Sequence, residues 1–224
     1  GNTFLYVLWT VPISTALAII IATLLNQKLR FSALFQTTYF LPMVTSVTAV
    51  GLVWRWIFNK NFGVLNAVLA FFGANPVDWL QKAGNSLTVL TVFGIWSSLP
   101  FTIILLLSGL QNIDETYYTV ARVDGARSIR IFRRITVPLL APTIGLVLII
   151  NSISAFKVFT EVKVLFNGYP GPVKNLYTVV YFIYDMMYEN RELGRAAAAA
   201  IVLFLFIFLF TMLQRWIQRR WKYD

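Results

Sequence analysis

The chain has 224 residues, of which 58% are hydrophobic, 16% aromatic and only 12% charged, and its mean hydropathy is +0.70. About a quarter of the residues of an ordinary soluble domain are charged, so this composition excludes a typical water-soluble protein. The sequence contains no cysteine and no histidine, which excludes disulfides, thiol chemistry and imidazole metal sites. We therefore expect a membrane protein that is not an enzyme and holds no metal, and we assign its net charge of +10 to loops rather than to nucleic-acid binding.

Long uncharged stretches predict the membrane spans, because a bilayer core needs about 20 apolar residues in helical form. Five stretches lack Asp, Glu, Lys and Arg, namely 1–27, 31–54, 83–113, 135–156 and 196–214. They predict an all-α, polytopic helical bundle forming a single transmembrane domain over residues 1–224. Prolines at positions 12, 42, 100 and 142 fall within or at the edges of these spans and favour bent helices around a cavity.

Basic residues predict the orientation, because cytoplasmic loops of membrane proteins are enriched in Lys and Arg. They concentrate in segment 111–137, in the C-terminal tail and in the first turn, which holds Lys28 and Arg30. We expect these segments on the cytoplasmic side of the inner cell membrane and Gly1 outside, with one further span upstream and six in the full subunit. On the outer side we expect a short helix within 59–82 lying along the surface, and a turn-rich loop at 166–172. The small residues 196–200 suit a helix start that allows close helix contact.

Segment 112–138 interrupts the spans on the basic side and predicts a helix-turn-helix elbow. Asp114 is a suitable N-cap for a helix reaching 123 or 124, and Gly125 is the residue that ends helices in a left-handed conformation. Residues 126–135 predict a second short helix at an angle, after which Pro138 opens the fourth span. One interpretation is an amphipathic hairpin whose arginines contact anionic membrane lipid.

The same segment resembles the binding-protein-dependent ABC importer permeases of the sugar class. The family signature is Glu-Ala-Ala, three residues, Gly, nine residues, and then Ile, any residue, Leu and Pro. The chain matches the spacing with Thr119-Val120-Ala121, Gly125 and Ile135-Thr136-Val137-Pro138, and departs from the residue types at Thr119, Val120 and Val137. Weaker matches are LP at 41–42, WSSLPF at 96–101, NGYPG at 167–171 and ELGRA at 192–196.

The resemblance implies that the elbow docks on a separate ATP-binding-cassette ATPase subunit, which holds the ATP and Mg²⁺. The implied docking residues are Thr119, Val120, Ala121, Asp124, Gly125, Ala126, Phe132, Ile135 and Pro138. It also implies a second homologous permease chain, an extracytoplasmic solute-binding protein, and alternating access for a polar solute such as an oligo- or disaccharide. The chain itself has no P-loop pattern.

Polar residues of the spans either side of the elbow are the implied substrate path, namely Ser97, Ser98, Phe101, Asn151 and Ser154. An equally open interpretation is that these serines and the asparagine form hydrogen bonds between or within helices. An ion-coupled secondary transporter is the alternative function. It usually keeps a carboxylate within the membrane, and none of the five predicted spans contains one.

Overall fold

A computed structural model describes residues 2–26 and 42–220 of the chain, and over these ranges it is helical and contains no strand. Four helical segments are long and apolar enough to cross a membrane: α1 (Asn2–Leu25), α5 (Ala83–Gln111), the run Ser128–Phe156 and α11 (Leu193–Arg220), of which Leu193–Gln218 qualifies as the span. These segments confirm four of the five predicted spans and the all-α fold class. The run Ser128–Phe156 begins seven residues before the predicted span and α11 extends beyond its predicted span at both ends, whereas α1 and α5 each end two residues earlier than predicted.

The second predicted span, 31–54, is wrong as one continuous helix. Residues 42–44 are helical, the chain bends at Thr45 and Ser46, and α3 then runs over Val47–Ile57, which is shorter than a membrane span. Ser46 has the extended φ and ψ of −60° and 126°. Serine and threonine are uncharged, so they do not interrupt the uncharged stretch 31–54 by which this span was predicted. Their side chains nevertheless favour non-helical backbone, which explains the break. The rest of this prediction lies outside the described residues.

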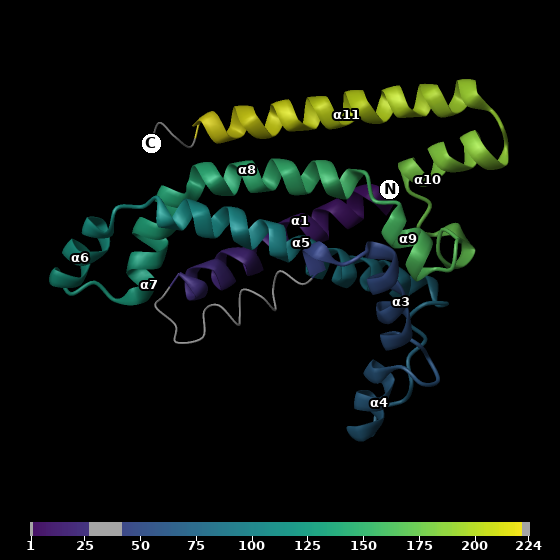
Figure 1. Cartoon of the computed structure of the whole chain (residues 1–224), viewed down its shortest axis with the longest axis horizontal. Coiled ribbons are helices and arrows are strands. Elements are labelled where there is room, and N and C mark those ends of the chain that lie inside the picture. The colour runs from purple at the N-terminus through teal and green to yellow at the C-terminus, as the bar shows by residue number, and fades with distance from the viewer. Residues whose placement is uncertain (1, 27–41, 221–224) are drawn as a thin grey trace.

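Three of the spans form the centre of the molecule. Helix α1 packs against both α5 and α8 (Val137–Phe156), and α5 also packs against α8. In Figure 1 these helices run lengthwise, with α6 (Glu115–Val123) and α7 (Ser128–Ile131) at one end and α3, α9 (Thr160–Leu165) and α10 (Val179–Tyr184) at the other. The C-terminal end of α11 lies at the same end as α6 and α7 (Figure 1).

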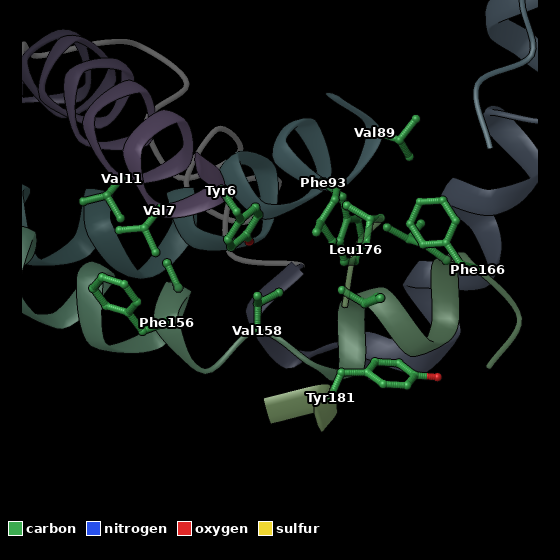
Figure 2. Packing of buried hydrophobic residues seen from close by; sticks show 14 of the residues in the cluster. Tyr6, Val7, Val11, Val89, Phe93, Phe156, Val158, Phe166, Leu176 and Tyr181 are labelled. Atoms are coloured by element: carbon green, nitrogen blue, oxygen red, sulfur yellow. The ribbon is translucent and has the colours of Figure 1, made fainter. Parts of the chain in front are cut away.

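The buried apolar side chains form two clusters, one toward each end of the three central helices. The first cluster joins the N-terminal half of α1 to α5, α8 and α9 through residues such as Tyr6, Phe93 and Phe156 (Figure 2). The second cluster joins the C-terminal half of α1 to α5 and α8 through small and branched residues such as Ala22, Ile103 and Leu140. Close packing at both ends fixes how α1, α5 and α8 lie relative to one another between them.

Helix α11 is packed much less than the other spans. Only 6% of its apolar window is buried, against 39–44% for the other three, and of the predicted small-residue run 196–200 only Ala196 is buried. It contacts α8 through two glutamines, with Gln214 Nε2 donating to Ser152 Oγ at 3.0 Å and Gln218 Nε2 donating to the Gly145 carbonyl at 3.0 Å. The exposed face is rich in Phe and Leu, which suits contact with lipid or with another apolar surface.

The two loops predicted to lie outside the membrane have the predicted local structure. Segment 59–82 contains one short helix, α4 (Val64–Phe71), and the buried Asn66 side chain holds its loop together by bonding to the backbone of Lys60 and Val77 and to the Trp79 indole. In Figure 1, α4 projects beyond α3 at the end of the molecule away from the elbow. Residues 166–171 form turns and bends, followed by a short 3₁₀ helix, Pro172–Lys174.

Candidate functional site

A cavity of about 380 Å³ lies between α1, α5, α8 and α9. All five residues predicted for the substrate path line it: Ser97, Ser98 and Phe101 from α5, and Asn151 and Ser154 from α8. Residues from separate predicted spans therefore meet at one place, and small-molecule sites commonly have volumes of about 300 to 1,000 Å³. We call this space the polar cavity.

Asn151 and Thr102 form a bond between helices at the edge of the polar cavity. Asn151 is 7% exposed, and its Nδ2 donates to the Oγ1 of the fully buried Thr102 at 3.0 Å. Thr102 in turn donates to the Ser98 carbonyl at 2.8 Å within α5. The cross-helix bond expected from the second interpretation is therefore present, and it orients the Asn151 amide in a wall of the cavity.

Helix α1 supplies a wall that the sequence argument did not identify. Tyr6, Thr10 and Ser14 line the polar cavity and recur every four residues, so they share one face of α1. Gly94 of α5 lies against the Tyr6 ring, and any side chain at Gly94 would overlap with that tyrosine. The spacing of these polar residues in the sequence, one every four positions, could have predicted that they share one face of α1.

Glu161 of α9 is a further lining residue that was not predicted from the sequence. It lies five residues beyond the end of α8, and the chain folds back there so that this half-buried carboxylate also lines the polar cavity. Among the described lining residues it alone is charged. Its position after a predicted span, rather than within one, is why a search for intramembrane carboxylates did not find it.

The elbow begins as predicted at its first helix. The Asp114 carboxylate caps α6 by accepting from the Thr116 amide at 2.8 Å, and this hydrogen bond lowers the pKa of the Asp114 carboxyl. At the other end, the Ala126 amide donates to the Ala121 carbonyl at 2.9 Å and the Gly125 amide to the Arg122 carbonyl at 3.0 Å. With φ of +70° at Gly125, this is a Schellman motif, which ends α6 and turns the chain.

The second half of the elbow differs from the prediction that Pro138 opens the fourth span. The helical run already begins at Ser128 and continues through α7, a π-turn at Phe132–Thr136 and α8. In the π-turn the Val137 amide donates to the Phe132 carbonyl, five residues back. Because Pro138 has no amide hydrogen, the wider turn lets the helix pass it instead of starting there. In Figure 1, α7 lies at an angle to α8.

The predicted docking residues have different exposures. Thr119, Val120, Asp124, Gly125 and Pro138 are exposed. Ala126, Phe132 and Ile135 are half-buried, and Ala121 is buried at 8% exposure. Thr119 donates its hydroxyl to the Glu115 carbonyl at 3.1 Å, so the residue that replaces the signature glutamate bonds within its own helix.

Two apolar residues near the turn were not among the predicted docking residues. Val123 is 83% exposed just before the Schellman motif, and Ile129 is 65% exposed just after it. A hollow of about 550 Å³ runs beside α6 and is lined by Tyr117, Val120, Ala121 and Ile135 among others. The elbow thus presents apolar side chains to its surroundings on both sides of Gly125.

A family assignment follows from comparison with known proteins. Residues 14–223 match the family of binding-protein-dependent transport system inner membrane components. The chain belongs to this family. The match covers the elbow and the lining of the polar cavity apart from the first twelve residues of α1, 2–13, and it confirms the family expected from the elbow signature.

Curated relatives in this family include sugar permeases. The xylose/arabinose import permease protein XacH of Haloferax volcanii is 37% identical over 160 residues, which are 71% of this chain and 50% of that protein. The arabinooligosaccharides transport system permease protein AraP of Bacillus subtilis is 31% identical over 200 residues, which are 88% of this chain and 63% of that protein. The chain thus spans between half and two thirds of the length of these permease relatives.

A solved structure shares the fold of the chain almost throughout. A bacterial ABC transporter involved in the import of the acidic polysaccharide alginate aligns with a TM-score of 0.88 at 23% identity, covering 98% of this chain and 77% of that one. At this identity the likeness concerns the fold, and it confirms the expected importer-permease fold.

Proposed function

We propose that this chain is a transmembrane subunit of an ATP-driven importer that passes a polar solute, an oligo- or disaccharide, across the cytoplasmic membrane by alternating access. The chain contributes no catalysis of its own, and ATP and Mg²⁺ are held by a separate ATPase subunit. The observation that carries this proposal is the elbow, which combines the signature spacing with a rigid turn and exposed apolar side chains.

The shape of the elbow suits docking on a protein more closely than lying on lipid alone. Residues Val120, Val123 and Ile129 are more than half exposed and stand on different sides of the turn at Gly125, which gives a protruding apolar tip. A single helix lying on lipid would present one apolar stripe, whereas here apolar side chains are exposed on both arms of the elbow, α6 and α7. The arginines around the tip are exposed, so they can contact anionic lipid beside a docked partner.

The polar cavity supports a path for the solute between the spans. It joins hydroxyl, amide and aromatic groups from α1, α5 and α8, and sugars are recognised by such hydrogen-bonding groups beside an aromatic ring. The sugar permeases among the relatives favour a saccharide as the solute. We expect a second homologous permease to complete the path, and a solute-binding protein to deliver the saccharide from outside.

The arrangement of the ends supports an orientation with the elbow and the C-terminus in the cytoplasm. The elbow and the C-terminal end of α11 lie at the same end of the spans in Figure 1, and that end carries the exposed arginines of segment 122–134 together with Arg215. Loop arginines are retained on the cytoplasmic side of a membrane. Helices α4, α9 and α10 are then extracytoplasmic, where the binding protein docks.

The test is co-purification of the complete subunit from its native membrane, followed by identification of the bound subunits and an ATPase assay in lipid. We expect a P-loop ATPase, a second permease and ATP hydrolysis that rises when the sugar-loaded binding protein is added. Solute uptake by the purified chain alone, driven by an ion gradient without ATP, would establish the secondary transporter instead. The four described spans contain neither Asp nor Glu, and Glu161, the one carboxylate among the described lining residues of the polar cavity, lies outside them on α9.

A further inference from the structure

We propose that Glu161 makes the polar cavity selective for uncharged carbohydrates and against solutes that carry a carboxylate. This inference rests on the proposed transport of a saccharide and concerns which saccharides the cavity accepts. It separates this chain from a transporter of an acidic polysaccharide, although the fold is shared.

The charge of Glu161 is not neutralised within the described part of the chain. No hydrogen bond or ion pair there involves its carboxylate. The nearest lysines along the chain are engaged elsewhere or face outward. Lys163 donates to the Tyr184 hydroxyl at 2.9 Å and lies over the Tyr184 ring, and Lys157 is exposed at the end of α8. The cavity therefore carries a negative charge that is available to a bound molecule.

Across the cavity, α1 offers a polar group that also lacks a partner. The Thr10 side chain is 3% exposed and its Oγ1 makes no hydrogen bond within the described residues. A buried hydroxyl without a partner is costly, so it is commonly satisfied by a bound water or ligand. Glu161, a strong acceptor, and Thr10, a donor or acceptor, thus face one space from different helices.

This combination fits a neutral polyhydroxylated molecule. A carboxylate accepts hydrogen bonds from two hydroxyls of a sugar, and bonds to a charged acceptor are stronger than those between neutral groups. A uronate would place a second negative charge near Glu161 in a partly dehydrated space, where charges repel much more than in water. Neither effect requires a change in the shape of the cavity.

The experiment measures equilibrium binding of radiolabelled sugars to the assembled transporter in lipid nanodiscs. The solute-binding protein is left out, because its own sugar specificity would mask that of the cavity. The uncharged probes are xylose, arabinose, maltose and lactose, and the anionic probes are glucuronate and digalacturonate. The variant is Glu161→Gln, which keeps the size of the side chain and removes its charge. Glu189→Gln is the matched control, because Glu189 is exposed and does not line the cavity.

We expect the unaltered transporter to prefer uncharged sugars, and Glu161→Gln to reduce the ratio of neutral to anionic binding by about tenfold while Glu189→Gln leaves it unchanged. An unchanged ratio in Glu161→Gln, with sugars still bound, overturns the role of Glu161 alone. Equal binding of glucuronate and neutral sugars by the unaltered transporter also overturns it. Failure of every sugar to bind or compete removes the proposed saccharide function itself.

Discussion

The polar cavity and the elbow are built in opposite ways. In the cavity, side chains such as Asn151 and Ser98 already have partners within the chain, and the packing of α1, α5 and α8 fixes their positions. In the elbow, the backbone is fixed by a cap and a Schellman motif, but Val123 and Ile129 have their side chains exposed. The side chains that line the cavity are thus held in place within the chain, whereas the apolar side chains of the elbow are left exposed, as the proposed docking requires. Substitutions in the two regions should therefore affect different measurements.

The largest effect that separates the two regions is expected from Gly125→Val. The φ of +70° at Gly125 is costly for a branched residue, by about 1–2 kcal/mol, and the Schellman motif would be lost or distorted. We expect the affinity of the permease pair for its ATPase to fall at least tenfold, measured by titration in nanodiscs, while sugar binding in the cavity stays unchanged.

The matched control is Gly125→Asn, because asparagine adopts the left-handed conformation more readily than other residues and nothing lies within 4 Å of the added Cβ. It should retain most of the ATPase affinity. Equal losses in both variants would mean that contact with the Gly125 surface, and not its backbone conformation, determines docking. An unchanged affinity in Gly125→Val would contradict a docking role for this turn.

Much of the elbow was predictable from sequence, because its signals are local. Asp114 before Glu115 indicates a helix start, and Gly125 indicates its end, whatever the rest of the chain does. The π-turn at Phe132–Thr136 was not predictable in this way. A proline in a helical pattern is compatible with a new helix as well as with a widened turn, and the choice depends on how α7 and α8 are connected in space.

The cavity was predictable on two of its walls. The family resemblance implied a substrate path on the spans either side of the elbow, and the polar residues named there, such as Ser97 and Asn151, line the cavity. Glu161 was missed because its place depends on the fold of α9 against α3 and α5, which hydropathy does not report. The break at Thr45–Ser46 was missed for a similar reason. Both residues are uncharged, so the hydropathy of the stretch is the same whether the helix continues through them or is interrupted there.

A smaller effect, confined to the cavity, is expected from Asn151→Ala. The substitution removes the amide and leaves the Thr102 hydroxyl without its cross-helix donor, so we expect half-maximal uptake to require about three to ten times more sugar. ATPase affinity should not change. Thr102→Val is the control, because it removes the same bond and keeps the amide. If Thr102→Val weakens uptake as much as Asn151→Ala does, Asn151 acts through helix packing and not through the solute.

The smallest effect is expected at a cluster that belongs to neither region, which we call the outer aromatic cluster and which consists of the rings of Phe159, Tyr177, Tyr181 and Tyr184. Tyr177 donates to the Asp185 carboxylate at 2.7 Å, and burial together with this bond raises the pKa of the Tyr177 phenol above its usual value of 10.0. Since the folded state holds this proton more tightly, the stabilisation is fully present below pH 10 and is lost as the pH rises through the raised pKa.

Tyr177→Phe should lower the free energy of unfolding by about 1 kcal/mol at neutral pH, and it should make the melting temperature fall less as the pH rises above 10. The control Tyr169→Phe, at a residue that is 70% exposed, should change neither. Any change in sugar binding or ATPase affinity in Tyr177→Phe would show that the outer cluster is coupled to one of the two sites, and the region affected would identify which.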